Sequence, residues 1–175
     1  MAGHDRPIEL KRIHHVELWV GNARQASYYY RKAFGFSQAA YAGLETGWRD
    51  RTSYLLEQNK IRFVLTTPLT DDGEINAFLT RHGDAVRDIA FEVEDVDGAF
   101  EAAVARGAEP ALEPRDVSDP NGTVRRAAVR TYGDTIHSFI ANKDYGGPFL
   151  PGFREDRVEE PDARLFYIDH MVGNV

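Results

Sequence analysis

Histidine and carboxylate side chains recur at matching places along this sequence, and their chemistry is that of metal ligands. His15, Asp88 and His137 each fall in a strand-like segment, and His170 falls in another such segment close to Val175. Imidazole and carboxylate groups suit iron, zinc or manganese, and a protein site needs at least three of them. The sequence therefore suggests either a site from the first three residues, or a site that His170 shares with ligands from elsewhere.

The first three residues have two interpretations, in which His14 is an alternative to its neighbour in the sequence. They could bind a divalent metal ion, or they could line a relic cavity that is closed by hydrogen bonds among its polar groups. We favour the relic cavity, because Arg62 would place a positive charge where the metal would bind. If Asp88 is buried, Arg62 or Arg87 is its expected partner.

Two stretches of the chain predict the same order of elements, which is strand, helix, strand, strand, strand. Asn22 and Asp95 are good helix caps, and each lies seven residues after a candidate site residue, His15 or Asp88. The first stretch predicts a helix over 23–33 and strands at 16–20, 37–41, 52–57 and 60–66. The second predicts a helix over 96–105 and strands at 88–93, 109–113, 124–130 and 135–140.

This repeat predicts an α+β fold in which two βαβββ units, at about 12–69 and 86–143, pair their sheets into a curved, partly open barrel. Residues 1–143 would form one N-terminal domain with the helices outside. Residues 144–167 have the proline, glycine and acidic composition of an interdomain linker, and their apolar side chains (Phe149, Leu150 and Phe153) should pack on a surface. Residues 168–175 would be the first strand of a second, catalytic domain.

The composition is typical of a globular protein, with 42% hydrophobic and 28% charged residues. The net charge is −7 and no basic run is long, which argues against nucleic acid and anionic membranes as partners. No apolar run approaches the roughly 20 residues of a membrane span. The chain has no cysteine, so it has no disulfide or thiolate metal site, and we expect a cytoplasmic location.

Eight short stretches, in this order, resemble the vicinal-oxygen-chelate (glyoxalase-like) superfamily and, within it, the family of 4-hydroxyphenylpyruvate dioxygenases. They cover nearly the whole chain, and it is the set in order that is specific. They are residues 19–23, 40–47, 63–65, 82–84, 88–93, 131–135, 149–152 and 168–170.

The resemblance implies a two-domain enzyme of tyrosine and aromatic amino acid metabolism that forms homogentisate. Its C-terminal domain would hold Fe(II) with two histidines and one glutamate, and would bind a small-molecule 2-oxo acid and dioxygen. His170 matches the first of these histidines, and the other two ligands would lie beyond Val175. By this reading the chain alone lacks its C-terminal domain, is inactive and binds no iron tightly. The family also suggests homo-oligomers.

Three alternatives remain open from the sequence. 4-Hydroxymandelate synthase shares these motifs. The chain could instead be a non-catalytic binding or scaffold module that self-associates through an exposed patch around Phe149 and Phe153. It could also be an independent glyoxalase-like binder or lyase that uses His15, Asp88 and His137.

Overall fold

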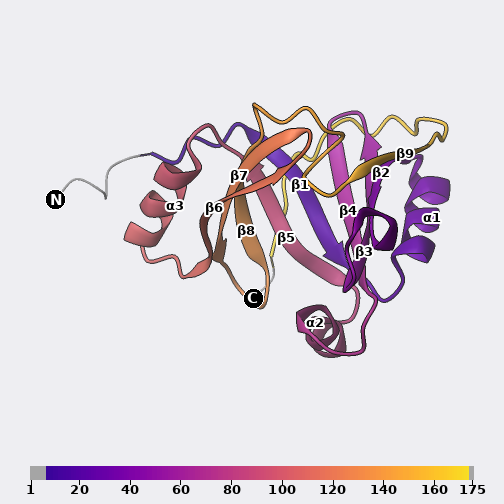
Figure 1. Cartoon of the computed structure of the whole chain (residues 1–175), viewed down its shortest axis with the longest axis horizontal. Coiled ribbons are helices and arrows are strands. Elements are labelled where there is room, and N and C mark those ends of the chain that lie inside the picture. Colours follow the sequence, from indigo (N-terminus) through magenta and orange to yellow (C-terminus); the bar gives the residue numbers. More distant parts are fainter. Residues whose placement is uncertain (1–6, 174–175) are drawn as a thin grey trace.

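A computed structural model of the chain describes residues 7–173. Over this range the structure has three α-helices and one sheet of nine strands, in the order β6-β7-β8-β5-β1-β4-β3-β2-β9 (Figure 1). The sheet is open, because β6 and β9 are its two edges and do not pair with each other. The α+β class and the curved, partly open barrel are therefore confirmed.

The first βαβββ unit begins with β1, which pairs in parallel with the last strand of the unit. Its helix α1 starts after Asn22, whose side chain accepts a hydrogen bond from the Gln25 amide at 3.0 Å, as the cap motif predicts. Gly35 ends the helix with a φ of 68°, in the left-handed region that favours glycine. The elements are β1 (Arg12–Trp19), α1 (Ala23–Phe34), β2 (Ser37–Ala42), β3 (Arg51–Gln58) and β4 (Ile61–Pro68).

The second unit repeats this order, and its first and last strands also pair in parallel. Asp95 caps its helix by accepting from the Gly98 amide at 2.9 Å. The two units join where β1 and β5 pair antiparallel along their lengths. The elements are β5 (Ala85–Glu92), α3 (Val96–Ala105), β6 (Pro110–Asp119), β7 (Gly122–Arg130) and β8 (Ile136–Ala141).

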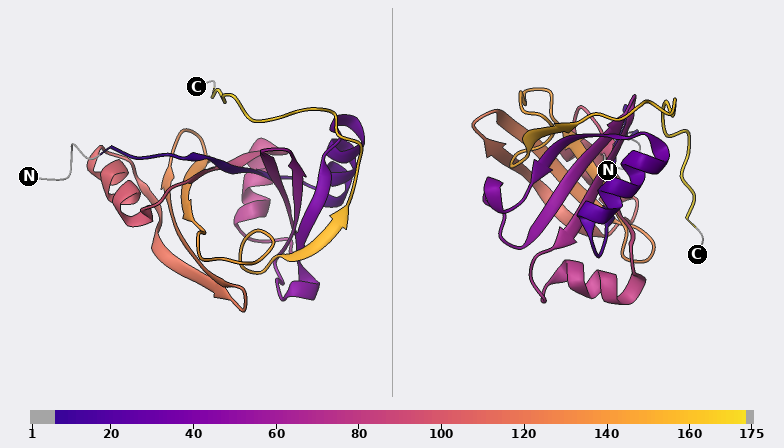
Figure 2. Two further views of the ribbon diagram at one scale, coloured as in Figure 1. Left: turned by 90° about the horizontal axis from the view of Figure 1, so that it is seen from above. Right: turned by 90° about the vertical axis from the view of Figure 1, so that its right-hand side faces the viewer.

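The two unit helices lie outside the curve of the sheet, at opposite ends of the molecule (Figure 2). Helix α1 buries Ala23 against Phe36, Leu56 and Leu65. Helix α3 packs Phe100 and its neighbours against the outer side of the second unit. The inner, concave side of the sheet is consequently free to form a site.

The structure has three elements that the sequence did not predict. Helix α2 (Glu74–His82) links the units and packs Phe78 against Trp19, with 5.1 Å between the ring centroids. A short 3₁₀ turn, Leu44–Thr46, follows β2. Strand β9 (Arg154–Val158) lies inside the expected linker and pairs antiparallel with β2, so this part of the linker belongs to the sheet.

The strand expected over 168–175 does not form in the described part of that segment, residues 168–173, and residues 174 and 175 lie outside the described range. A strand needs a neighbour for its backbone groups, and β9 already occupies this end of the sheet. Met171 and Val172 are exposed. The division into a domain, a linker and a further domain stays a prediction.

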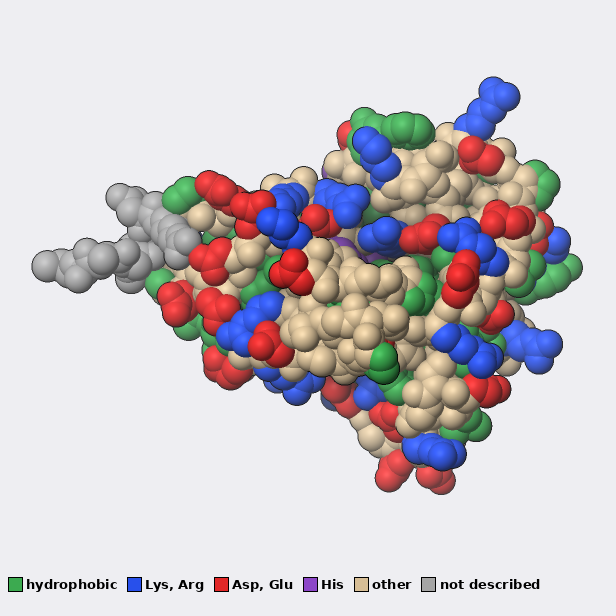
Figure 3. Space-filling view, turned by 45° about the horizontal axis from the view of Figure 1, so that its top comes forward, with side chains coloured by type: hydrophobic (Ala, Val, Ile, Leu, Met, Phe, Trp, Pro, Cys, Tyr) green, Lys and Arg blue, Asp and Glu red, His purple; other side chains and the backbone are tan. Residues whose placement is uncertain are grey.

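Acidic and basic side chains are interspersed over the face that Figure 3 shows, with little of the histidine surface visible. This mixed pattern agrees with the overall negative charge and the absence of a basic run in the sequence. Within residues 7–173, no helix is long and apolar enough to cross a membrane.

Candidate functional site

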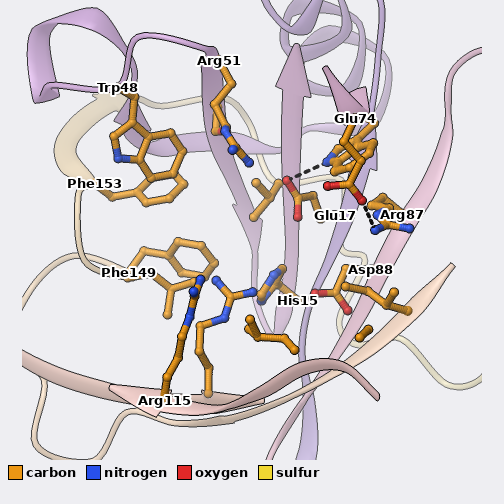
Figure 4. A pocket seen from close by; sticks show the side chains of 18 of the residues that line it. His15, Glu17, Trp48, Arg51, Glu74, Arg87, Asp88, Arg115, Phe149 and Phe153 are labelled. Atoms are coloured by element: carbon orange, nitrogen blue, oxygen red, sulfur yellow. Dashed lines mark hydrogen bonds and ion pairs between the residues drawn. The ribbon is translucent and has the colours of Figure 1, made fainter. Parts of the chain in front are cut away.

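The concave side of the sheet encloses a cavity of about 340 Å³ between the two units (Figure 4). Both units contribute to its wall, and so do α2 and the segment that leads from β8 to β9. Its lining residues are His15, Glu17, Trp19, Trp48, Arg51, Ser53, Val64, Glu74, Arg87, Asp88, Ala111, Leu112, Arg115, Arg126, Arg130, Ile136, Phe149, Leu150 and Phe153.

His14 and His15 are both buried because β1 has a bulge at this point, where its pairing with β5 skips from Ile13 to His15. Their Nδ1 atoms are 2.8 Å apart, so one ring donates and the other accepts. The Asn142 amide nitrogen lies 3.1 Å from His14 Nε2 and donates to it. His14 must then carry its proton on Nδ1, which leaves His15 with its proton on Nε2.

Burial, with the nearby Arg62 and Arg12 guanidiniums as further causes, lowers the pKa of His14 to about 3. Burial, with His14 and Arg126 as further causes, also holds the pKa of His15 well below its usual range. Both rings are therefore neutral at pH 7.

Asp88 is also buried, and its partner is Ser138. The Ser138 amide donates to one carboxylate oxygen at 3.0 Å, and the Ser138 hydroxyl donates to the other at 2.5 Å. Burial raises the pKa of Asp88 to about 6 in spite of these hydrogen bonds. The expectation that Arg62 or Arg87 would pair with Asp88 is wrong, because Arg62 pairs with Glu57 and Arg87 with Glu74.

These pKa shifts predict that acidification destabilises the fold. His14 binds its proton near pH 6.5 when unfolded and only near pH 3 when folded, so its contribution falls by about 2 kcal/mol between pH 7 and pH 5. His15 acts in the same direction. Asp88 acts in the opposite direction, because its pKa is higher in the folded state than in the unfolded state. Between pH 7 and pH 5 its protonation stabilises the fold by about 1 kcal/mol.

We therefore expect the free energy of unfolding, measured with urea, to fall by more than about 1 kcal/mol from pH 7 to pH 5, because His15 adds to the net loss from His14 and Asp88. Asp88→Asn, which cannot titrate, should make this fall larger. Equal stability at both pH values would contradict the burial of neutral histidines.

His137 does not line the cavity. In β8 the side chains of Ile136 and Ser138 face the cavity side, where Ile136 lines the wall and Ser138 binds Asp88, so alternation turns His137 to the other face. There its ring packs on Phe91 with 5.2 Å between the centroids. The structure thus brings His15 and Asp88 to one cavity and leaves His137 outside it.

His170 lies in the exposed segment after β9. Its Nδ1 is 2.8 Å from the Asp169 carboxylate, and both side chains are more than 70% exposed. Among residues 7–173, no group of three or more histidine, aspartate or glutamate side chains could hold a metal ion. The residues described here therefore do not by themselves fit an Fe(II) site.

Phe149 and Phe153 are buried, so they do not form the exposed patch considered for self-association. The segment that carries them crosses the concave side of the sheet from β8 to β9 (Figure 2). Phe149 contacts both His14 and His15, with ring centroids 5.5 and 5.2 Å apart, and Phe153 packs on Trp48. These rings account for much of the burial of the histidine pair.

Sequence reasoning missed the cavity residues Arg115 and Arg126 and the role of Ser138, and it gave Arg87 the wrong partner. Arg115 and Arg126 are register partners on β6 and β7, and Arg87 lies 4.7 Å from the centroid of the Trp19 ring. Period-two spacing could have placed Ser138 with Ile136 rather than with His137. The pairing of Arg115 with Arg126 depends on bulges in β6 that the sequence does not mark.

Comparison with known proteins gives a consistent result. Residues 14–124 match the family model described as the glyoxalase/bleomycin resistance protein/dioxygenase superfamily. A 4-hydroxyphenylpyruvate dioxygenase of Neurospora crassa is 46% identical over 91% of this chain and 44% of its own length. A protein of the same name from Xenopus tropicalis is 43% identical over 93% of this chain and 43% of its own. The chain thus spans less than half the length of these relatives.

Solved structures of other enzymes have a similar fold. A mutant of 4-hydroxymandelate synthase from Streptomyces coelicolor superposes with a TM-score of 0.73 at 30% identity, over 90% of this chain and 44% of that one. A methylmalonyl-CoA epimerase from the same organism superposes with a TM-score of 0.61 at 19% identity, over 75% of this chain and 97% of the other. At that identity the second similarity shows the fold alone.

Proposed function

The chain belongs to the glyoxalase/bleomycin resistance protein/dioxygenase superfamily, and on this premise we propose that it is the N-terminal part of an Fe(II)-dependent 4-hydroxyphenylpyruvate dioxygenase. One observation carries the proposal: a relative of that name is 46% identical over 91% of the chain. The complete protein would convert 4-hydroxyphenylpyruvate and dioxygen to homogentisate and carbon dioxide in tyrosine catabolism. A cytoplasmic location and homo-oligomers stay predictions.

In this proposal the chain supplies one iron ligand, His170. The other ligands would come from the part of the complete protein that corresponds to the unmatched length of the relatives. The metal would provide the oxidative chemistry, and apart from His170 the residues described here would not take part in that step. Asp169 would hold the His170 ring through Nδ1 and leave Nε2 free to bind a metal. The two βαβββ units would then serve as the supporting half of the enzyme.

4-Hydroxymandelate synthase is the second candidate, because a mutant of that enzyme shares the fold at 30% identity. Both candidates start from the same 2-oxo acid, and they differ in their product. Identification of the product therefore separates them.

The test is oxygen uptake by a full-length protein that carries this chain, with 4-hydroxyphenylpyruvate as substrate and chromatography of the products. We expect one homogentisate for each dioxygen consumed, and no uptake by residues 1–175 alone with added Fe(II). 4-Hydroxymandelate as the product would favour the second candidate. An iron-loaded full-length protein that consumes no oxygen would contradict both.

A further inference from the structure

Two arginines lie directly opposite each other on neighbouring strands of the second unit. Arg115 on β6 and Arg126 on β7 are register partners, and both line the cavity. Like charges in this position destabilise a sheet unless something between them is negative. The next pair along the same two strands is balanced, because Arg125 bonds its register partner Asp116 at 3.2 Å and Asp97 at 2.6 Å.

The cavity's own carboxylates have other partners. Glu74 pairs with Arg87, Glu17 accepts from Thr66 and Trp19, and Asp88 accepts from Ser138.

Within residues 7–173, no carboxylate oxygen lies within 4 Å of the Arg115 or Arg126 guanidinium, and the buried Nε of Arg126 has no hydrogen-bond partner. Arg126 therefore reaches the cavity without a close ion-pair partner, and Asp88 attracts it only at longer range. The exposed Arg115 faces the cavity from the neighbouring strand. A buried donor with no partner is uncommon in folded proteins and calls for one.

The surroundings of this pair define the shape of a partner. His15 is neutral, and by the tautomer argued above its Nε2 carries a proton, so it adds a third donor at the cavity wall. Arg115 extends from β6 toward the Phe149 ring (Figure 4). Phe153 and Trp48 continue an aromatic wall beyond Phe149. Donors for an anion thus stand beside an apolar surface.

We propose that this cavity binds a small organic carboxylate, with the carboxylate group between the Arg115 and Arg126 guanidiniums and its apolar body against Phe149 and Phe153. Guanidinium groups bind carboxylates in a two-pronged arrangement, and the aromatic wall removes an apolar body from water. A volume of about 340 Å³ is at the lower end of ligand cavities and suits a single small molecule. The inference is independent of the proposed dioxygenase activity.

The test is binding of phenylacetate to the 175-residue chain, measured by calorimetry and by tryptophan fluorescence. The sequence has two tryptophans, Trp19 and Trp48, and both line the cavity, so a fluorescence change locates the bound molecule. The matched probes are 2-phenylethanol, which has the ring without the charge, and inorganic phosphate, which has charge without a ring. We expect the heat of binding and the tryptophan fluorescence to saturate at lower concentrations of phenylacetate than of either other probe.

Arg115→Met and Arg126→Met should each weaken phenylacetate binding about tenfold or more, because each removes a charge-assisted hydrogen bond. The midpoint of thermal unfolding should not fall in either variant, since each also removes a like-charge repulsion. Arg24→Met is the control, because Arg24 is exposed on α1 and its loss changes the net charge equally. It should bind as the unaltered chain does.

Four results would overturn the proposal. The first is no saturable binding of phenylacetate by the unaltered chain, and the second is unchanged affinity in both folded arginine variants. The third is equal affinity for 2-phenylethanol, which would show that the charges are not used. The fourth is tighter binding of phosphate than of phenylacetate, which would show that the aromatic wall is not used.

Discussion

Replacing His170 by alanine in a full-length protein that carries this chain should abolish iron binding and lower the rate of oxygen uptake at least about 1000-fold. A ligand of a three-residue iron site has no substitute, and even changes outside the ligand shell cost roughly 10- to 100-fold. Iron content per chain and oxygen uptake with 4-hydroxyphenylpyruvate are the two measurements.

This variant should fold normally, because His170 is exposed and its one hydrogen bond is to the equally exposed Asp169. The matched control is His82→Ala, which removes a histidine on α2 that pairs with Asp134. The control should keep its iron. Full iron content in the His170→Ala variant would refute the assignment of His170 as a ligand.

Phe149→Ala should lower the free energy of unfolding by about 3 kcal/mol, toward the low end of the range for a buried phenylalanine. The ring is 4% exposed and packs between the histidine pair and Phe153. The neighbouring cavity lets water enter the space left by the ring, which limits the loss. Urea unfolding of the 175-residue chain at pH 7 measures it.

The same change should also weaken the pH dependence of stability. Once Phe149 is gone, His14 and His15 are less desolvated, so their pKa values move back toward 6.5 and the loss between pH 7 and pH 5 becomes smaller. Phe166→Ala is the control, because that ring is 56% exposed, and it should cost less than about 0.5 kcal/mol. Equal losses in the two variants would show that Phe149 is not a packing residue.

The repeated elements could be predicted from the sequence because their signals are local. Asn22 and Asp95 cap helices as expected, and the strands between them keep their order. Helix α2 was missed because its first residue follows Gly73, which offers no side-chain cap, although Ile75, Phe78 and Leu79 have helical spacing. Strand β9 was missed because its charged residues show no apolar alternation.

The candidate site was predictable only in part. His15 and Asp88 line one cavity because the first strands of the two repeated units pair. The repeat could not show that β1 bulges at His14, or which face of β8 turns inward, and these two features decide that His14 is buried and His137 is outside. The sequence also could not show that Phe149 packs on His15, because the two residues are more than 130 positions apart.

An open sheet has two edges with unpaired backbone groups, and such edges can recruit strands from other molecules into fibres. Here one edge is β9, whose sequence from Arg154 to Arg157 is four charged residues in succession. The other is β6, in which Pro114 lacks an amide proton and sits where the pairing with β7 is irregular. Charge at one end and a broken hydrogen-bonding pattern at the other make both edges poor templates, so the curved sheet can remain open without growing into an aggregate.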